Sequence, residues 1–154
     1  MNILLSHGYF LEEDAKEQKI MRPYPPLGLL YISAYLEKHG IPNVVFDTTF
    51  SGKNEFRHYL KATKPGIVGL YVNLMTKLTI LDIISFIRKN LPETKVILGG
   101  PDVRYNAENY LRSGADFIVM GEGEQTMLEL VRGLLDPSEQ TDRIAGIACL
   151  RDGS

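Results

Sequence analysis

Two short apolar runs that stop at glycines constrain this chain more than any other feature. They are Val-Ile-Leu-Gly-Gly-Pro-Asp at residues 96–102 and Phe-Ile-Val-Met-Gly-Glu-Gly-Glu at residues 117–124. A continuous apolar run rich in β-branched residues is typical of a strand buried in a parallel sheet. Glycines at the carboxyl end of such a strand let a ligand approach the backbone, and ligands of open parallel sheets bind beyond these ends. The two glycine turns therefore predict part of the floor of one binding site.

Strand patterns and helix patterns alternate along the rest of the chain, which predicts an α/β fold. Strands are expected at residues 2–6, 43–47, 67–71, 95–98 and 116–120. Helices are expected from Pro25-Pro26 to Gly40 and at residues 52–63, 76–90, 106–112 and 124–135. The alternation predicts a five-stranded parallel sheet in the order 2-1-3-4-5 with helices on both faces, and a sixth strand has room at residues 147–150.

Three details of this pattern are specific enough to test. On the first helix, the spacing of Leu27, Leu30, Tyr31 and Ala34 predicts one apolar face directed at the core. Asn106 is expected to cap the short fourth helix. Residues 7–24 carry many charges and form a connection long enough to be functional or mobile.

Composition excludes several classes of protein. The chain has 154 residues, which suits one domain with its own core, and a net charge of -2, which does not indicate nucleic acid as a partner. No apolar run is long enough to span a membrane, and the first residues form no signal peptide. A cytoplasmic protein is therefore expected. The single cysteine, Cys149, excludes a disulfide within the chain, and a small buried residue in a late strand is its simplest interpretation.

Common catalytic and nucleotide-binding motifs are absent. No glycine-rich turn ends in Gly-Lys-Ser/Thr, and no G-x-G-x-x-G follows the first strand. A phospho-acceptor receiver domain has the same alternation of strands and helices, but its acidic residues and lysine are replaced here. The corresponding positions hold Ser6-His7, Tyr71-Val72 and Gly121-Glu122.

Individual polar residues leave alternatives open. His7 lies at the carboxyl end of the first strand and is either a ligand or an ordinary loop histidine. Glu122 and Glu124 suit helix capping or acid–base chemistry, and their charges would repel a phosphate. No catalytic triad can be assembled, and no residue is assigned as catalytic or as a metal ligand.

Several of these segments together resemble one family. Pro-Pro-Leu-Gly at residues 25–28, Val-Phe-Asp at 45–47 and Ile-Val-Gly-Leu at 67–70 resemble the start of the cobalamin-binding domain that precedes a radical S-adenosylmethionine domain. Leu-Gly-Gly-Pro-Asp at 98–102, the run 115–124 with Thr126, and Ile-Ala-Gly-Ile at 144–147 extend the resemblance over essentially the whole chain.

The resemblance implies a flavodoxin-like (Rossmann-like) three-layer sandwich that binds cobalamin, with the corrin over the carboxyl ends of the strands and the nucleotide tail beside the sheet. It implies a domain at residues 1–143 and a linker beginning at 144–154. The cofactor-binding candidates follow four strands: His7, Gly8 and Tyr9; Tyr71, Asn73, Leu74, Met75 and Thr76; Gly99, Gly100, Pro101 and Asp102; and Gly121, Glu122 and Gly123. Replacing Gly100 by a bulky residue is expected to abolish binding while sparing the fold.

Two departures from the family pattern qualify what the resemblance implies. An iron–sulfur cluster of the radical domain needs C-x-x-x-C-x-x-C, which a chain with one cysteine lacks. The cluster, S-adenosylmethionine and the methyl transfer or radical chemistry would therefore belong to a domain elsewhere, in cis or in trans, and this segment alone would have no activity.

The second departure concerns the cobalt ligand. The D-x-H-x-x-G motif that supplies a histidine would need Asp at Leu5 and Gly at Phe10. We therefore expect base-off cobalamin without a histidine ligand. The alternative is the same fold without a cofactor, serving as a scaffold or a dimerisation domain. A homodimer fits either interpretation.

Overall fold

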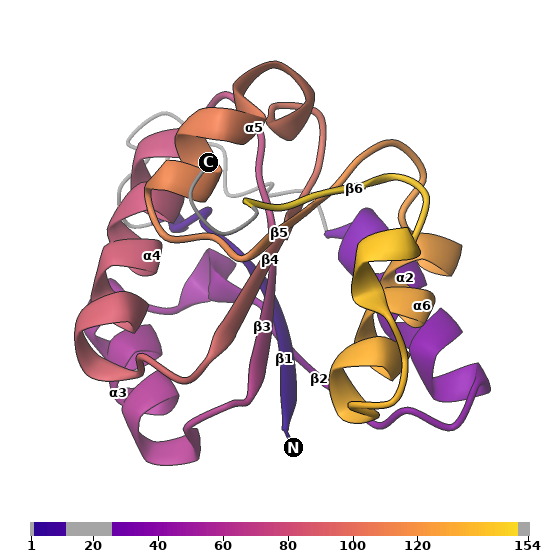
Figure 1. Cartoon of the computed structure of the whole chain (residues 1–154). Helices are drawn as coiled ribbons and strands as arrows, with labels where there is room; N and C mark the ends of the chain where they lie inside the picture. The colour runs from indigo at the N-terminus through magenta and orange to yellow at the C-terminus, as the bar shows by residue number, and fades with distance from the viewer. Residues whose placement is uncertain (1, 12–25, 151–154) are drawn as a thin grey trace.

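The computed structural model describes residues 2–11 and 26–150, and in them a six-stranded sheet lies between two layers of helices (Figure 1). The strands run in the order β2-β1-β3-β4-β5-β6. In chain order the elements are β1 (Ile3–His7), α2 (Leu27–Lys38), β2 (Val44–Phe46), η2 (Thr48–Phe50), α3 (Lys53–Thr63), β3 (Ile67–Tyr71), α4 (Lys77–Asn90), β4 (Lys95–Gly99), α5 (Val103–Arg112), β5 (Phe117–Val119), α6 (Glu124–Leu135), η3 (Thr141–Arg143) and β6 (Ile147–Ala148).

The predicted sheet order is confirmed. Strands β1 to β5 are parallel, so their carboxyl ends meet at one edge of the sheet. The sixth strand is present, but it is shorter than residues 147–150 and pairs antiparallel with β5. It lies beyond the boundary expected at residue 143, and Cys149, which follows it, is partly buried.

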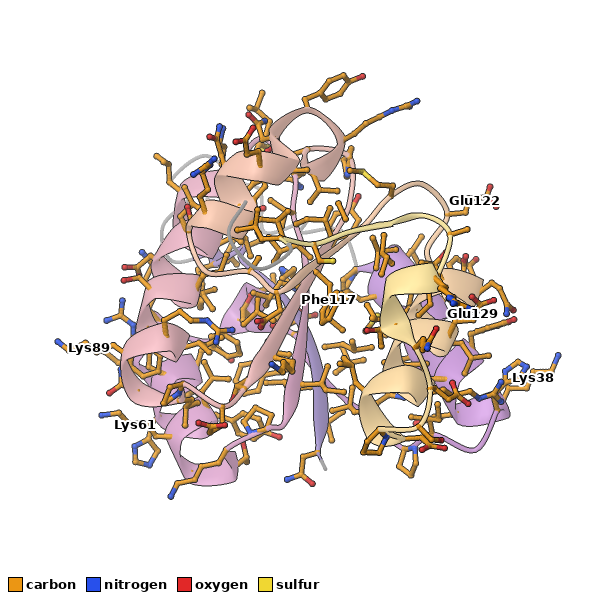
Figure 2. All side chains as sticks on the ribbon, viewed as in Figure 1. Lys38, Lys61, Lys89, Phe117, Glu122 and Glu129 are labelled. Carbon is orange, nitrogen blue, oxygen red and sulfur yellow. The ribbon has the colours of Figure 1, made fainter. Side chains whose placement is uncertain are left out.

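Two hydrophobic clusters fill the space between the sheet and its helices. Helices α2 and α6 cover one face of the sheet, and α3, α4 and α5 cover the other (Figure 1). Neighbouring residues of each strand point to opposite faces. Leu4, Val68 and Val96 form a row in register toward α3–α5, whereas Leu5, Gly69 and Ile97 form the next row toward α2 and α6. Figure 2 shows Lys61 and Lys89 projecting outward on one side of the molecule and Lys38 on the other.

The inward face predicted for α2 is wrong. Leu27, Leu30 and Tyr31 are 56%, 44% and 64% exposed, and Ala34 is exposed too, whereas Leu29 and Leu36 are buried. Residues 27–32 at the start of α2 are all aliphatic, aromatic or glycine, so a second apolar stripe with helical spacing competes with the predicted one. The packing of α2 against β1 and α6 selects the stripe that contains Leu29 and Leu36.

Glycines end two helices as the sequence predicts. Gly40 has φ +80° and follows α2, where the amides of Gly40 and Ile41 donate to the carbonyls of Glu37 (3.0 Å) and Leu36 (2.9 Å). This pair of bonds is the Schellman motif, which favours glycine because the left-handed conformation strains other residues. Gly114, at φ +117°, follows α5.

Helix α5 begins before its predicted cap, and part of the chain lies outside the described residues. Helix α5 begins at Val103, so the prediction that Asn106 caps it is wrong, and Asn106 instead interrupts the helix with φ -129°. Pro25, most of the charged connection at residues 7–24, and the exit at 151–154 lie outside the described residues. Within the described ranges, every helix is too short or too polar to span a bilayer.

Candidate functional site

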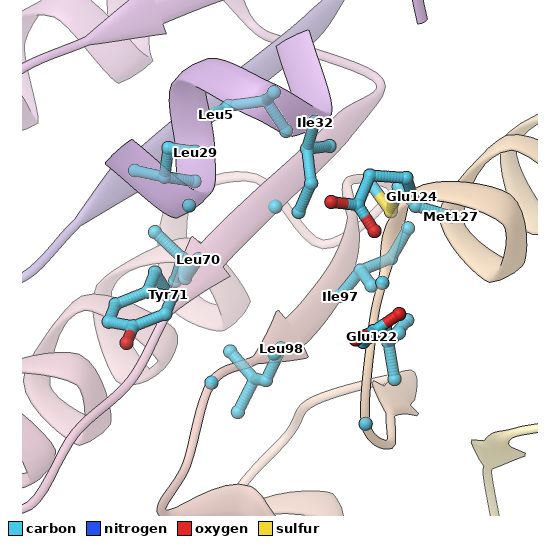
Figure 3. Close-up of a pocket in the computed structure, with 17 residues that line it drawn as sticks. Leu5, Leu29, Ile32, Leu70, Tyr71, Ile97, Leu98, Glu122, Glu124 and Met127 are labelled. Carbon is cyan, nitrogen blue, oxygen red and sulfur yellow. The ribbon is translucent and has the colours of Figure 1, made fainter. Parts of the chain in front are cut away.

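A pocket of about 340 Å³ opens at the carboxyl edge of the sheet, on the side of α2 and α6 (Figure 3). Its floor is the row Leu5, Gly69 and Ile97, covered by Leu29 from α2 and Met127 from α6. Its rim holds Tyr71 and the residues of the two glycine turns. Six of the candidate residues line the pocket: Tyr71, Gly99, Gly100, Gly121, Glu122 and Gly123.

Glycine beside the pocket lets neighbouring side chains pack close to the backbone. A Cβ atom on Gly69 would lie 2.7 Å from Leu5 Cδ2 and 3.3 Å from Met127 Cε, so even alanine would collide with side chains that already pack against the strand. A Cβ on Gly28, in the first turn of α2, would lie 3.6 Å from the Tyr71 ring. Glycine inside a strand lowers stability, so the close packing at Gly69 comes at a cost, whereas a side chain at Gly28 would make ordinary contact with the ring.

Gly99 and Gly100 play different parts at the rim. Gly100 has φ +110°, and a Cβ there would collide with the backbone of Val72, so a bulky residue at Gly100 would disturb the fold. The expectation that such a change spares the fold is therefore wrong. Gly99 lies outside the left-handed region, and a Cβ there meets nothing within 4 Å. Gly99 is consequently the position at which a side chain can enter the pocket without backbone strain.

The loop between β3 and α4 divides its four candidate residues between two roles. The Asn73 side chain accepts from the Thr76 amide (3.0 Å), and Thr76 Oγ1 accepts from the Asn73 amide (3.1 Å). These reciprocal bonds close the turn that leads into α4 and engage both side chains. Leu74 and Met75 between them are 79% and 77% exposed at the same edge of the sheet.

Asp102 is held inside the protein. Its Oδ2 accepts hydrogen bonds from the hydroxyl of the buried Tyr110 and from Asn106 Nδ2 (3.3 Å). Burial, reinforced by the adjacent Asp102 carboxylate, raises the pKa of Tyr110 above its ordinary value. Pro101 is exposed, and neither Pro101 nor Asp102 lines the pocket.

His7 is buried, with both ring nitrogens engaged. Nδ1 accepts from the backbone amide of Tyr9 (3.2 Å), so the ring proton belongs on Nε2, which donates to Asp47 Oδ1 (2.8 Å). Thr48 Oγ1 donates to the carbonyl of His7 (2.9 Å). Gly8 and Tyr9 follow directly, and a Cβ on Gly8 would lie 3.0 Å from Ile80 Cδ1 of α4. None of these three candidates lines the pocket.

Asp47 fixes His7 from the end of the neighbouring strand. Burial raises the pKa of Asp47, but hydrogen bonds from the side chain and backbone of Thr49 and from His7 outweigh it and hold that pKa below its ordinary value. The carboxylate is thus charged at neutral pH and fixes the ring orientation. Across the described residues, no three side chains of His, Cys, Asp or Glu gather closely enough to hold a bare metal ion.

Sequence reasoning missed the pocket floor. Leu5, Leu29, Ile32, Gly69, Ile97 and Met127 line the pocket but were not candidates. Gly69 carried a usable signal, because an isolated glycine inside a strand marks a close approach of another group. Leu29 and Ile32 were missed because the wrong stripe of α2 was assigned to the core.

Comparisons with known proteins agree on one family. A model of the B12 binding domain matches residues 19–131. An uncharacterized methyltransferase of Pyrococcus horikoshii is 33% identical over 129 residues, which are 79% of this chain and 27% of that protein. The anaerobic magnesium-protoporphyrin IX monomethyl ester cyclase of Rubrivivax gelatinosus is 26% identical over 155 residues, 96% of this chain and 27% of that protein. The chain thus spans about a quarter of the length of these curated relatives.

Solved structures share the fold. The cobalamin-dependent S-adenosylmethionine radical enzyme OxsB with aqua-cobalamin bound superposes with a TM-score of 0.77 at 21% identity, over 98% of this chain and 21% of that chain. A response regulator from Thermotoga maritima superposes with a TM-score of 0.58 at 19% identity, over 88% of this chain and 98% of that chain. Likeness at this identity extends to the fold alone, and the phospho-acceptor residues expected of a receiver are absent here.

Proposed function

The chain belongs to the B12-binding domain family, and from that premise we propose that it is the cobalamin-binding module of a radical S-adenosylmethionine enzyme. The nucleotide tail of cobalamin enters the pocket between the sheet and the α2–α6 layer, and the corrin lies over the carboxyl edge. The observation that carries this proposal is the pocket itself, which lies at the carboxyl edge of the sheet and is lined mostly by apolar residues of the strands, α2 and α6.

The described residues match the chemical character of such a ligand. The pocket is predominantly apolar, as ligand sites generally are, and suits an aromatic base. At the edge above it, the exposed Leu74 and Met75 offer apolar surface to the underside of the corrin. Four further candidates lie at this edge and outside the pocket. They would support the backbone around the corrin: Gly8, Tyr9, Pro101 and Asp102. Bound cobalamin supplies a cobalt centre that carries a methyl group or takes part in radical chemistry.

We infer further that the cofactor is bound base-off and without a histidine ligand. A histidine that binds a metal through one ring nitrogen is usually oriented by a hydrogen bond on the other. Here Nε2 of His7 donates to Asp47 and Nδ1 accepts from Tyr9, so neither nitrogen has a free lone pair directed at a ligand. In the D-x-H-x-x-G motif, the aspartate that orients the histidine would stand at Leu5. In this chain Asp47 provides that carboxylate, and its hydrogen bond fixes the orientation of the His7 ring.

The catalytic half belongs to another domain in this proposal. The chain has one cysteine, so a three-cysteine iron–sulfur site and the S-adenosylmethionine that it serves must lie elsewhere. The length of the curated relatives leaves room for such a domain in the same polypeptide. The substrate of the complete enzyme is determined there.

A cofactor-free scaffold is the competing function. The exposed apolar stripe of α2, which includes Leu27, Leu30 and Tyr31, would suit an interface. A scaffold needs no pocket, however, so the two functions differ in whether the pocket binds cobalamin.

Titration with cobalamin, followed by absorbance, tests the proposal. We expect saturable binding of one cobalamin per chain. Gly99→Val should weaken it roughly a hundredfold, about 2.7 kcal/mol, because the new side chain enters the pocket without straining the backbone. Lys95→Val, at the opposite end of β4, is the matched control and should bind like the parent. Absence of binding by the parent chain, or full binding by Gly99→Val, would contradict the proposal.

A further inference from the structure

The pocket changes in polarity from its floor to its rim. The floor residues Leu5, Gly69 and Ile97 carry no polar side-chain atom, and neither do Leu29 and Met127 above them. The polar side chains of the lining are Tyr71, Glu122 and Glu124, which stand at or above the ends of the strands. Figure 3 shows the carboxylates of both glutamates among the apolar side chains of the opening.

The backbone of the floor is equally unavailable for hydrogen bonding. Leu5, Gly69 and Ile97 each lie in a strand that is paired on both sides, since β1 pairs with β2 and β3, β3 with β1 and β4, and β4 with β3 and β5. Their amides and carbonyls are engaged in the ladders of the sheet. A group that reaches the floor therefore finds van der Waals contacts and no hydrogen-bond partner.

On the basis of the proposed function, we propose that this pocket selects cobamides by their lower base, accepting a benzimidazole and rejecting a purine. The two bases share a five-membered imidazole ring and differ in the fused six-membered ring. In dimethylbenzimidazole this ring is a hydrocarbon with two methyl groups, which gains by leaving water. In adenine it carries two ring nitrogens and an amino group, which would lose water on the floor without replacement.

The rim completes the selection by orienting the tail. Among the described residues, neither Glu122 nor Glu124 forms an ion pair or a hydrogen bond, and Lys38, which lines the adjoining outer groove, does not reach them. Free carboxylates accept hydrogen bonds and repel phosphate. The hydroxyl groups of the ribose can therefore lie at the rim while the base occupies the floor, and the phosphate stays outside.

Three ligands measured on the parent chain test this selectivity. They are cobalamin, the cobamide with adenine as lower base, and cobinamide, which has the same corrin and no nucleotide. We expect cobalamin to bind at least roughly tenfold more tightly than the adenine cobamide, about 1.4 kcal/mol. We expect the adenine cobamide to bind within about threefold of cobinamide, because its base gains nothing from the floor.

The outcomes separate this inference from the proposed function. Equal affinity for the two cobamides overturns the inference, whether or not both bind more tightly than cobinamide, and it leaves cobalamin binding intact. Failure of all three ligands to bind refutes the proposed function itself.

A substitution on the floor gives a second measurement. Met127→Gln places an amide beside Gly69 and should reduce the preference for cobalamin over the adenine cobamide at least threefold, because the amide can pair with purine nitrogens. Met120→Gln makes the same change outside the pocket and should leave the preference unchanged. An unaltered preference in folded Met127→Gln contradicts the inference, and if that variant does not fold, the comparison of ligands on the parent chain decides.

Discussion

The two faces of the sheet are built from neighbouring residues of the same strands, yet among the described residues the apolar pocket at the carboxyl edge lies on the face of α2 and α6. Toward α3, α4 and α5, the row Leu4, Val68 and Val96 presents three branched side chains to a continuous core. One residue further along each strand, the row Leu5, Gly69 and Ile97 presents two large side chains and a glycine to α2 and α6. Gly69 lies in the pocket floor, where its missing side chain lets Leu5 and Met127 pack close to the strand.

This difference shows how a binding site is placed in a sheet without changing its topology. Side chains that border an empty pocket lack van der Waals contacts on one side, whereas those of the filled face are surrounded. The face with the pocket therefore contributes less to stability than the filled face. A ligand that occupies the pocket recovers part of that loss, about 2.7 kcal/mol at a hundred times its Kd.

The largest expected effect comes from shortening one isoleucine on each face. Ile118 of β5 is fully buried in the filled cluster, and Ile97 of the neighbouring β4 is 2% exposed and borders the pocket. We expect Ile118→Ala to lower the free energy of unfolding by about 4 kcal/mol and Ile97→Ala by about 2 kcal/mol, because Ile97 has fewer packed neighbours to lose. Urea denaturation of the ligand-free variants measures both values.

The same pair separates packing from ligand binding. Folded Ile118→Ala should keep the affinity of the parent for cobalamin, whereas Ile97→Ala changes it, since the floor of the pocket is altered. Equal losses of stability in the two variants would show that the pocket face is packed as well as the other face, and the comparison would then be wrong.

The sequence predicted the sheet better than it predicted the helices that pack on it. Continuous apolar strands and the left-handed glycines Gly40 and Gly114 are local signals, and the structure agrees with them. The inward face of α2 depends on which of two apolar stripes meets the sheet, and that choice is made by tertiary contacts with β1 and α6. The start of α5 was misplaced because Asp102 and Asn106 both resemble caps, and the first of them lies at the boundary.

The rim of the site was predictable and its floor was not. Rim residues such as Gly99 and Gly121 lie at or just beyond the carboxyl ends of strands, so the rule that ligands bind at these ends finds them directly. Floor residues lie inside strands and helices, where an apolar side chain that lines a pocket looks like any core residue. The partner of His7 was also hidden, since Asp47 is distant in sequence and adjacent only because β1 pairs with β2.

Acid titration tests whether the His7–Asp47 pair stabilises the folded chain. The pKa of Asp47 is lower in the folded chain than in the unfolded chain, so its contribution is present above the ordinary pKa near 3.8 and is lost as pH falls through the folded value. We expect Asp47→Asn to cost about 1 kcal/mol at neutral pH, a low value because the side chain is 43% exposed. Urea midpoints of the parent and Asp47→Asn should converge as pH falls from the ordinary pKa near 3.8 through the lower pKa of the folded chain. A gap between them that persists once Asp47 is protonated in the folded chain would assign the loss to something other than the charge.

The smallest expected effect concerns His7 and the cofactor. His7 is in register with Tyr71 on the neighbouring strand. Tyr71 lines the pocket and His7 does not, so the pocket ends between β3 and β1 at this level of the sheet. Its Nε2 donates to Asp47 and its Nδ1 accepts from the Tyr9 amide, so the ring supports the exit of β1 and offers no lone pair to cobalt. His7→Ala should therefore leave the absorbance spectrum of bound cobalamin unchanged and alter the affinity by less than roughly tenfold, about 1.4 kcal/mol. His7→Gln, which keeps a polar side chain at the same place, should restore any lost stability without changing the spectrum. Two results would contradict this prediction: a spectral shift in His7→Ala, or nitrogen hyperfine structure from an imidazole in the paramagnetic resonance spectrum of bound cob(II)alamin. Either result would show that His7 binds the metal and that the binding site extends to β1.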